Sequence, residues 1–350
     1  VYLNPGNDMF CETVRGEIYV DKTELIRETN RRLKTPQKFV CISRPRRFGK
    51  SMAAYMLAAY YGKNCDSKEL FAPYKISTCD SYEKYLNQYN VIMLNIQDFL
   101  SMTSSVEEML SCLQSEVIRE LCEVYPDVVS KDERILSMAL NRLYGKKKEA
   151  FVFIIDEWDC ILRDRSYHAD DQKKYLDFIR NLLKDKAYVA LAYMTGILPI
   201  KKYGTHSALN MFDEYSMIDA GDFQEFVGFT EEEVRILCEQ YRIDFEMMKS
   251  WYDGYTFPSA GHVYNPKSVV DSLRRKRFGS YWTQTETYEA LKIYIDLNYD
   301  GLKDAITEML AGQRVCIHTD RFQNDMTTFE SKDDVLTLLV HLGYLAYDSD

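Results

Sequence analysis

The chain has 350 residues, of which 46% are hydrophobic and 28% are charged, and its formal net charge is −10 at pH 7. These values are ordinary for a soluble globular protein and leave room for two or three domains. They argue against nucleic-acid binding by the surface as a whole, because phosphate binding needs a basic face, and leave only a local patch for that purpose.

The apolar runs and the cysteines of the sequence indicate the cellular compartment to expect. No apolar run is long enough to span a membrane, and the sequence shows no signal-peptide pattern. The nine cysteines include no Cys-x-x-Cys pair. We therefore expect reduced thiols in a cytoplasm, no zinc site and no membrane contact. Because the first residue is Val1, we also expect an amino terminus that has been trimmed or processed.

The leading segment, residues 1–37, predicts a short strand, a cap and a helix around residues 19–26. Asp21 is suited to the cap. Alternatively, Asp21 and Lys22 contact the phosphate ligand that the next motif predicts.

That motif, residues 38–53, is the stretch on which the rest of the chain depends. A β-leaning segment runs into a basic turn, and Gly49-Lys50-Ser51 then opens a predicted helix. This arrangement binds phosphates, because loop N–H groups and the helix dipole point at the anion. Gly49 lets the backbone approach, Lys50 would reach the β- and γ-phosphates of ATP, and Ser51 would hold Mg²⁺.

The match to the phosphate-loop pattern Gly-x4-Gly-Lys-Ser/Thr is imperfect, since Arg44 stands at its first position. Gly-Lys-Ser alone is common by chance, so the alternative is a basic surface turn before a helix. Arg46 and Arg47 of the turn either face the phosphates or brace the loop against acidic neighbours. The nucleotide-binding residues that we predict are Arg46, Arg47, Phe48, Gly49, Lys50, Ser51 and Met52.

After the helix that follows the loop, residues 90–96 predict a second core strand with Gln97 and Asp98 at its carboxyl end. These two side chains belong either to a functional site or to a polar turn. Residues 104–125, capped by a serine, and residues 131–143 predict two further helices. Strands that alternate with helices of these lengths are typical of a parallel α/β sheet.

A second motif, residues 151–157, strengthens the interpretation of the phosphate loop. Its five apolar residues predict a strand buried on both faces, and Asp156 and Glu157 end it. Ligands of parallel sheets lie beyond the carboxyl ends of the strands. Asp156 would therefore hold Mg²⁺, and Glu157 would act as the general base for a water molecule. The alternative is a strand that ends in a solvated acidic turn.

Six motifs occur in order: RPRRFGKS, IIDEWD, TGILPI, GFTEEEV, WYDGY and VYNPKSV. From about residue 19 to about residue 345, the chain resembles the AAA-ATPase-like family of bacterial proteins, whose phosphate loop reads RPRRFGK followed by Ser or Thr. The resemblance implies an α/β P-loop NTPase fold of the AAA-like type, related to STAND-type archaeal ATPases. We expect a P-loop core at residues 1–218, a helical lid at 219–260 and a winged-helix-like segment at 261–350.

Several residues after the acidic motif also have candidate roles, and the resemblance assigns the first of them. Thr195, at the end of a predicted strand, would sense the γ-phosphate; the alternative is a Thr-Gly turn. Asp159 would orient the loop or pair with a phosphate-loop arginine. Lys201 and Lys202 would neutralise the γ-phosphate or lie on a solvated surface, and His206 has no partner visible in the sequence.

The carboxyl-terminal part offers structural signals and a basic run. Thr230 and Glu233 form a capping box that starts a helix, and Pro266 marks the first turn of another. The residues Arg274, Arg275, Lys276 and Arg277 either contact DNA or form a solvated helix end.

We therefore predict an ATP-binding, Mg²⁺-dependent ATPase that acts as a conformational switch. Many family members continue into a PD-(D/E)XK nuclease-like domain, so the switch would control such an effector, whose motif this chain lacks. The alternative is a nucleotide-gated binding module with little turnover that contacts DNA or a protein partner. The chain could form a homo-oligomer.

Overall fold

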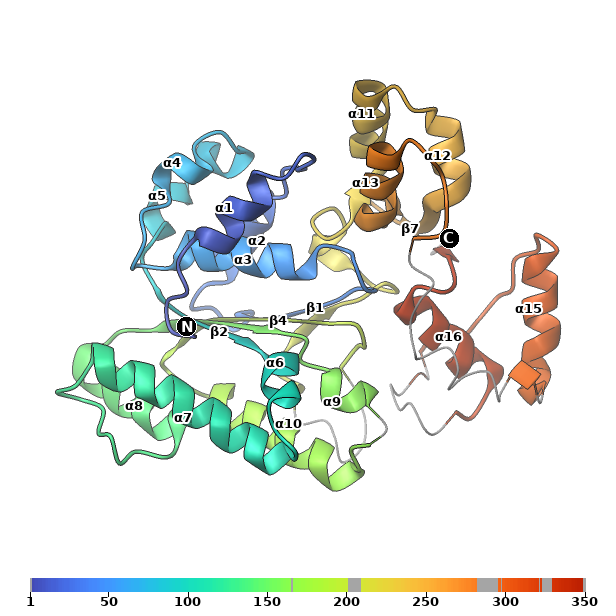
Figure 1. The fold of residues 1–350 in the computed structure, drawn as a ribbon. Coiled ribbons are helices and arrows are strands. Elements are labelled where there is room, and N and C mark those ends of the chain that lie inside the picture. Colours follow the sequence, from blue (N-terminus) through green and yellow to red (C-terminus); the bar gives the residue numbers. More distant parts are fainter. Residues whose placement is uncertain are drawn as a thin grey trace. The chain divides into compact units, whose positions relative to one another are not determined.

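The computed structural model describes residues 2–164, 166–200, 209–281, 295–296, 298–320, 322 and 329–348 (Figure 1). The chain divides into two compact units. The first comprises Val1–Ile42, Gly49–Gly196 and Gly204–Tyr215, and the second comprises Ser43–Phe48, Ile197–Tyr203 and Ser216–Asp350.

The first unit is built on a sheet with the strand order β2-β3-β4-β1-β5. The strands are β1 (Phe39–Ser43), β2 (Asn90–Asn95), β3 (Phe151–Asp156), β4 (Val189–Gly196) and β5 (Asp213–Tyr215). β2 pairs with β3, β3 with β4, and β1 with β5, each in parallel. Helices cover both faces of this sheet in Figure 1. The predicted α/β core with a parallel sheet is confirmed.

The central strands are buried, as their apolar sequences predict. Every residue of β1, β3 and β4 is buried, which fits strands that helices cover on both faces. Ile155 of β3 is the register partner of Met194 of β4. The next residues along these two strands, Asp156 and Thr195, therefore lie side by side at the carboxyl edge of the sheet.

The helices of the first unit follow these strands in alternation. They are α1 (Asp8–Val14), α2 (Glu24–Arg32), α3 (Lys50–Tyr61), α4 (Lys68–Phe71), the 3-10 helix η1 (Lys75–Thr78), α5 (Tyr82–Tyr85), α6 (Ile96–Ser101), α7 (Val106–Val124), α8 (Leu136–Lys147), α9 (Cys160–Arg163) and α10 (Ala169–Leu183). The serine cap predicted for α7 is confirmed, since Ser105 Oγ accepts a bond from the Glu108 N–H at 3.1 Å.

One helix start differs from the prediction because a side chain binds the backbone locally, whereas α2 begins at Glu24 as predicted. The helix predicted from residue 131 begins at Leu136. Glu133 Oε1 accepts from the N–H groups of Arg134 and Ile135 at 3.1 and 3.2 Å, which holds a turn in place of the first helical residues. Asp21 lies just outside α2, where its carboxylate accepts from the N–H and hydroxyl of Thr23 at 2.9 and 2.7 Å.

The second unit contains a smaller sheet with the order β6-β8-β7-β9. Its strands and helices are β6 (Phe229–Thr230), β7 (Asp253–Phe257), β8 (Gly261–Tyr264), β9 (Tyr347–Asp348), η3 (Gly221–Phe223), α11 (Glu231–Tyr241), α12 (Phe245–Tyr252), α13 (Pro266–Arg275), η4 (Tyr299–Gly301), α15 (Leu302–Leu310) and α16 (Lys332–Leu342). The capping box of Thr230 and Glu233 is present at α11. The division into core, lid and winged-helix-like segment at residues 218 and 260 stays a prediction.

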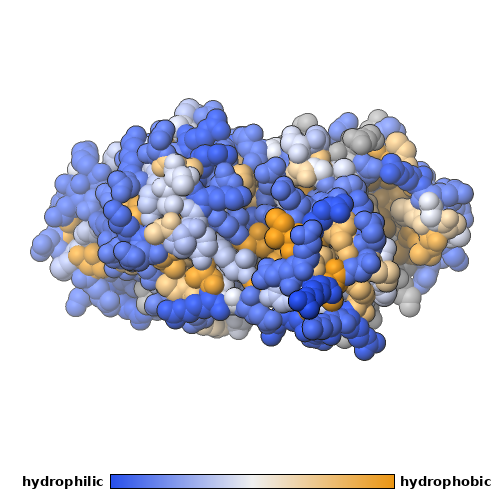
Figure 2. Space-filling view, turned by 90° about the horizontal axis from the view of Figure 1, so that it is seen from above, coloured by the Kyte–Doolittle hydropathy of each residue, from blue (hydrophilic) through white to orange (hydrophobic). Residues whose placement is uncertain are grey.

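The surface carries scattered apolar side chains. The face shown in Figure 2 is mostly hydrophilic, with apolar residues gathered in a few places. Exposed large apolar residues include Met52, Met138 and Trp251, and single exposures of this kind are normal. In the described part of the chain, no helix combines the length and the apolar character needed to cross a membrane.

Candidate functional site

The phosphate-loop residues stand where β1 passes into α3. Gly49 occupies the N-cap position of α3 with φ 91°, and Lys50 and Ser51 are the first residues of the helix. A Cβ at Gly49 would meet no atom within 4 Å, so the left-handed backbone, and not crowding, is what requires glycine here. The turn thus directs the first N–H groups of a twelve-residue helix toward the carboxyl edge of the sheet.

Asp156 joins three parts of the first unit. Its Oδ2 accepts a hydrogen bond from the Ser51 hydroxyl at 2.6 Å, and its Oδ1 accepts from the Thr195 hydroxyl at 2.7 Å. The N–H of Glu157 also donates to Oδ1, at 3.0 Å. Asp156 is 1% exposed, so these hydrogen bonds replace those that water would make to its carboxylate. The structure therefore brings the predicted residues Ser51, Asp156 and Thr195 together.

Lys50 lies in the same acidic surroundings. Its side chain is 5% exposed. Burial lowers the pKa of the Lys50 ammonium, while the carboxylates of Glu157, Asp156 and Asp159 oppose that shift. A buried cation beside carboxylates is suited to an anionic ligand, because the positive charge is only partly hydrated.

Glu157 has a partner that the sequence analysis missed. Nη2 of Arg163 donates a hydrogen bond to Oε2 of Glu157, and Arg163 Nε lies 3.1 Å from Oδ2 of Asp159. Asp159 thus pairs with an arginine of α9. The spacing of Asp159 and Arg163, four residues apart, is the signal that could have suggested the pair, since such residues share a helix face.

The close packing around position 196 explains why Thr195 is followed by a glycine. A Cβ at this position would lie 2.6 Å from Nε1 of Trp158 and 2.7 Å from Oδ1 of Asp159. Real Cβ atoms do not approach so closely. The glycine therefore lets β4 pack directly against the segment that follows Asp156.

The donors at this site fit Mg²⁺. A buried carboxylate beside a serine hydroxyl supplies hard oxygen ligands, which Mg²⁺ prefers. Among the described residues, no group of three or more His, Cys, Asp and Glu side chains could hold a metal ion by itself. Mg²⁺ often binds through one or two carboxylates together with substrate phosphates.

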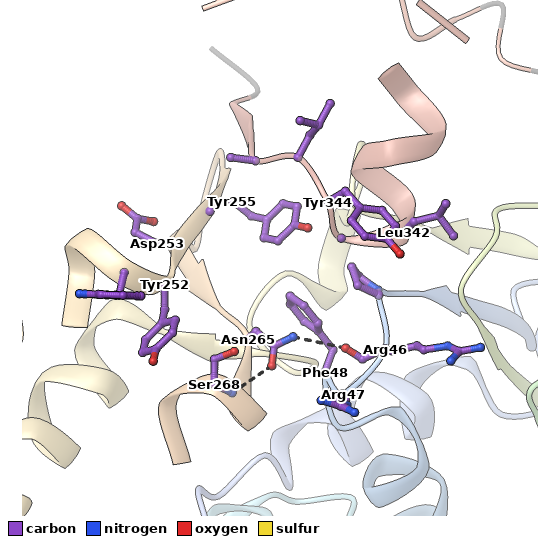
Figure 3. Close-up of a pocket in the computed structure, with 16 residues that line it drawn as sticks. Arg46, Arg47, Phe48, Tyr252, Asp253, Tyr255, Asn265, Ser268, Leu342 and Tyr344 are labelled. Carbon is purple, nitrogen blue, oxygen red and sulfur yellow. Dashed lines mark hydrogen bonds between the residues drawn. The ribbon is translucent and has the colours of Figure 1, made fainter. Parts of the chain in front are cut away.

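Arg46, Arg47 and Phe48 lie in the second unit, around a cavity of 180 Å³ (Figure 3). Phe48 is 2% exposed, and its ring centroid lies 5.8 Å from that of Tyr255. The Arg46 carbonyl accepts from Nδ2 of Asn265 at 3.3 Å, and the guanidinium of Arg47 donates to the carbonyl of Tyr281. In Figure 3 the Arg46 side chain points away from the rings of Phe48 and Tyr255. Their nucleotide contacts stay predictions.

Two further predicted groups are exposed. Met52, which follows Ser51 on α3, is 45% exposed. The basic run of Arg274 and its neighbours up to Arg277 ends α13 and is exposed. Lys201, Lys202 and His206 lie outside the described residues.

Arg44, the departure from the phosphate-loop pattern, is wholly buried in the second unit. Its guanidinium donates to the carbonyls of Ser43 and Phe223 at 2.9 and 3.3 Å and lies 5.6 Å from the ring centroid of Phe257. Arg44 therefore ties the start of the loop to residues far away in the sequence.

Residues 9–205, more than half of the chain, match the family described as Predicted AAA-ATPase. The chain belongs to this AAA-ATPase-like family. A curated protein of Azotobacter chroococcum mcd 1, described as "Uncharacterized protein in vnfD 5'region", is 25% identical over 295 residues. That match covers 81% of this chain and 54% of the relative, so the chain spans about half the relative's length.

Two solved structures are also similar. The Walker-type ATPase PABY2304 of Pyrococcus abyssi is 14% identical, with 83% of this chain and 74% of that chain covered and a TM-score of 0.37. The Aeropyrum pernix ORC1 protein, solved in complex with DNA, is 10% identical, with 88% and 82% covered and a TM-score of 0.34.

Proposed function

We propose that this AAA-ATPase-like chain binds ATP and hydrolyses it with the help of Mg²⁺. The observation that carries the proposal is the hydrogen bond of 2.6 Å between Ser51 and the buried Asp156, beside the buried Lys50. A phosphate-loop hydroxyl and the carboxylate at the end of another strand of the sheet are the ligand pair that holds Mg²⁺ in P-loop enzymes.

Each residue of the first unit has a part in this proposal. Lys50 and the first N–H groups of α3 bind the β- and γ-phosphates. Ser51 and Asp156 would hold Mg²⁺, which neutralises charge on the phosphates when it is bound. Thr195 keeps Asp156 in place and, through that bond, is suited to sense the γ-phosphate.

Glu157 is the proposed general base. A water oxygen attacks the γ-phosphorus, the bond to the β,γ-bridging oxygen breaks, and ADP leaves with that electron pair. Glu157 accepts the proton that the water loses. The products are ADP and inorganic phosphate.

The first experiment tests ATP binding. Lys50→Ala removes the cation that the proposal places on the phosphates, so calorimetry with ATP and Mg²⁺ should show binding to the wild type and little to the variant. Lys146→Ala, at an exposed lysine of α8, is the matched control and should bind like the wild type. Equal ATP binding by the wild type and Lys50→Ala would contradict the assignment of the loop.

A second candidate is a nucleotide-gated module with little turnover. Four exposed cations at the end of α13, from Arg274 to Arg277, favour an output through contact with DNA or an acidic partner. In either case we propose a cytoplasmic switch for an attached effector. Binding of ATP without release of phosphate would favour the second candidate.

A further inference from the structure

Arg163 connects Glu157, the proposed base, to the buried carboxylate of Asp159, which we call its anchor. Its side chain is 10% exposed, that of Asp159 is fully buried, and that of Glu157 is 26% exposed. Nη2 binds Oε2 of Glu157, whereas Nε faces Oδ2 of Asp159. One guanidinium therefore joins a fully buried carboxylate to one that is partly exposed to solvent.

The chain around Asp159 holds this anchor rigidly. α9 is a single turn, in which the N–H of Arg163 donates to the carbonyl of Asp159 at 3.1 Å. The N–H of Cys160 donates to the carbonyl of Glu157 at 3.2 Å. Gly196 packs against this carboxylate, since a Cβ at that position would lie 2.7 Å from Oδ1 of Asp159. The single turn of α9 therefore brings the guanidinium of Arg163 back to the carboxylate of Glu157, six residues earlier in the chain.

The two neighbouring carboxylates keep the guanidinium of Arg163 protonated. Burial acts to lower the pKa of Arg163, but the carboxylates of Asp159 and Glu157 outweigh it and raise the pKa above its usual value. Arg163 is therefore a cation at every physiological pH. A planar guanidinium can bind two carboxylates at once, which a lysine ammonium does with less defined geometry.

Glu157 needs such a restraint to work as a base. Its backbone has φ 53°, in the left-handed region that a non-glycine residue adopts only when its surroundings enforce it. Its long, partly exposed side chain would otherwise occupy several rotamers. A base must lie within hydrogen-bond reach of the proton that it accepts, and small misplacements reduce rates strongly. Because Arg163 binds Oε2, we assign Oε1 to the attacking water.

We propose that Arg163 is a positioning residue for hydrolysis, which acts by fixing the carboxylate of Glu157 from its anchor on Asp159. This inference rests on the proposed function, in which Glu157 is the base. Arg163 itself accepts no proton and needs no contact with ATP.

The test is a double-mutant cycle of phosphate release. Arg163→Lys and Arg163→Gln should each lower kcat about 10- to 100-fold, while ATP affinity and KM change less than about twofold, because only the base is displaced. In a Glu157→Gln background, either substitution should have little further effect, since the group that Arg163 positions is already inactive. Arg119→Lys, in an exposed ion pair with Glu116, is the matched control and should leave kcat unchanged.

The outcomes separate this inference from the function on which it rests. Wild-type kcat in Arg163→Lys and Arg163→Gln, or a higher kcat, would overturn the positioning role while hydrolysis stands. An equal loss in the Glu157→Gln background would assign Arg163 a structural role instead. Arg163→Lys keeps a cation beside Asp159 and decides the matter if Arg163→Gln melts too early for assay. If the wild type releases no phosphate, the proposed function fails and this inference fails with it.

Discussion

The carboxylate of Asp156 accepts hydrogen bonds from Ser51, Thr195 and the backbone of Glu157. The sequence predicted Ser51 and Asp156 at one site, because the phosphate-loop pattern specifies a hydroxyl after Lys50 and a second motif places an acidic residue at a strand end. The bond from Thr195 was not predicted, since the resemblance placed Thr195 at the γ-phosphate. The partner of Glu157 could not be predicted, since nothing in the pattern assigns a role to Arg163. Arg44 departs from the general phosphate-loop pattern, and its bond to the carbonyl of Phe223, which is 179 residues away, could not be predicted from the sequence.

A prediction at this scale concerns Thr195. Thr195→Val preserves the shape of the side chain but removes the hydroxyl that binds Asp156, so it should lower the free energy of unfolding by about 1–3 kcal/mol. The rate of phosphate release should fall roughly tenfold or more, because Asp156 is less well held. Thr195→Ser keeps a hydroxyl and should retain most of the wild-type rate. Wild-type turnover in Thr195→Val, measured at saturating ATP, would show that Thr195 has no role in hydrolysis.

The elements were predicted best where a local chemical signal exists. The apolar runs predicted β3 and β4, and the serine cap predicted the start of α7. The start of α8 was predicted too early, because the bonds from Glu133 to the following N–H groups depend on side-chain geometry that spacing alone does not reveal. The pattern of residues 288–310 also predicts a helix; residues 295–296 and 298–310 of that range are described, and they contain α15.

The capping box of α11 gives a prediction at the element scale. Thr230 Oγ1 accepts from the N–H of Glu233, and the Glu233 carboxylate accepts from the N–H of Thr230 at 2.8 Å. Thr230→Ala should destabilise the protein by about 0.5–2 kcal/mol, measured by chemical denaturation. Ser115→Ala, at an exposed site within α7, is the control and should be neutral or slightly stabilising. If Thr230→Ala unfolds like the wild type, the box does not stabilise α11.

For the whole molecule, the fold class and the family could be predicted, because strand and helix alternation and several specific motifs point the same way. The biological output could not. The chain spans about half the length of its curated relative, so the effector and its partners stay proposals. The proposed roles of Lys50, Ser51, Asp156, Glu157 and Thr195 all fall on residues of the first unit.

Hydrolysis of ATP by the wild type and by Glu157→Gln, measured as phosphate release at saturating ATP with Mg²⁺, tests the central claim most directly. Removal of a positioned base lowers a rate by about 10² to 10⁴. We predict that Glu157→Gln binds ATP as the wild type does but releases phosphate more slowly by such a factor. Glu107→Gln, at an exposed residue of α7, should hydrolyse at the wild-type rate. Equal rates for the wild type and Glu157→Gln would contradict the assignment of the base.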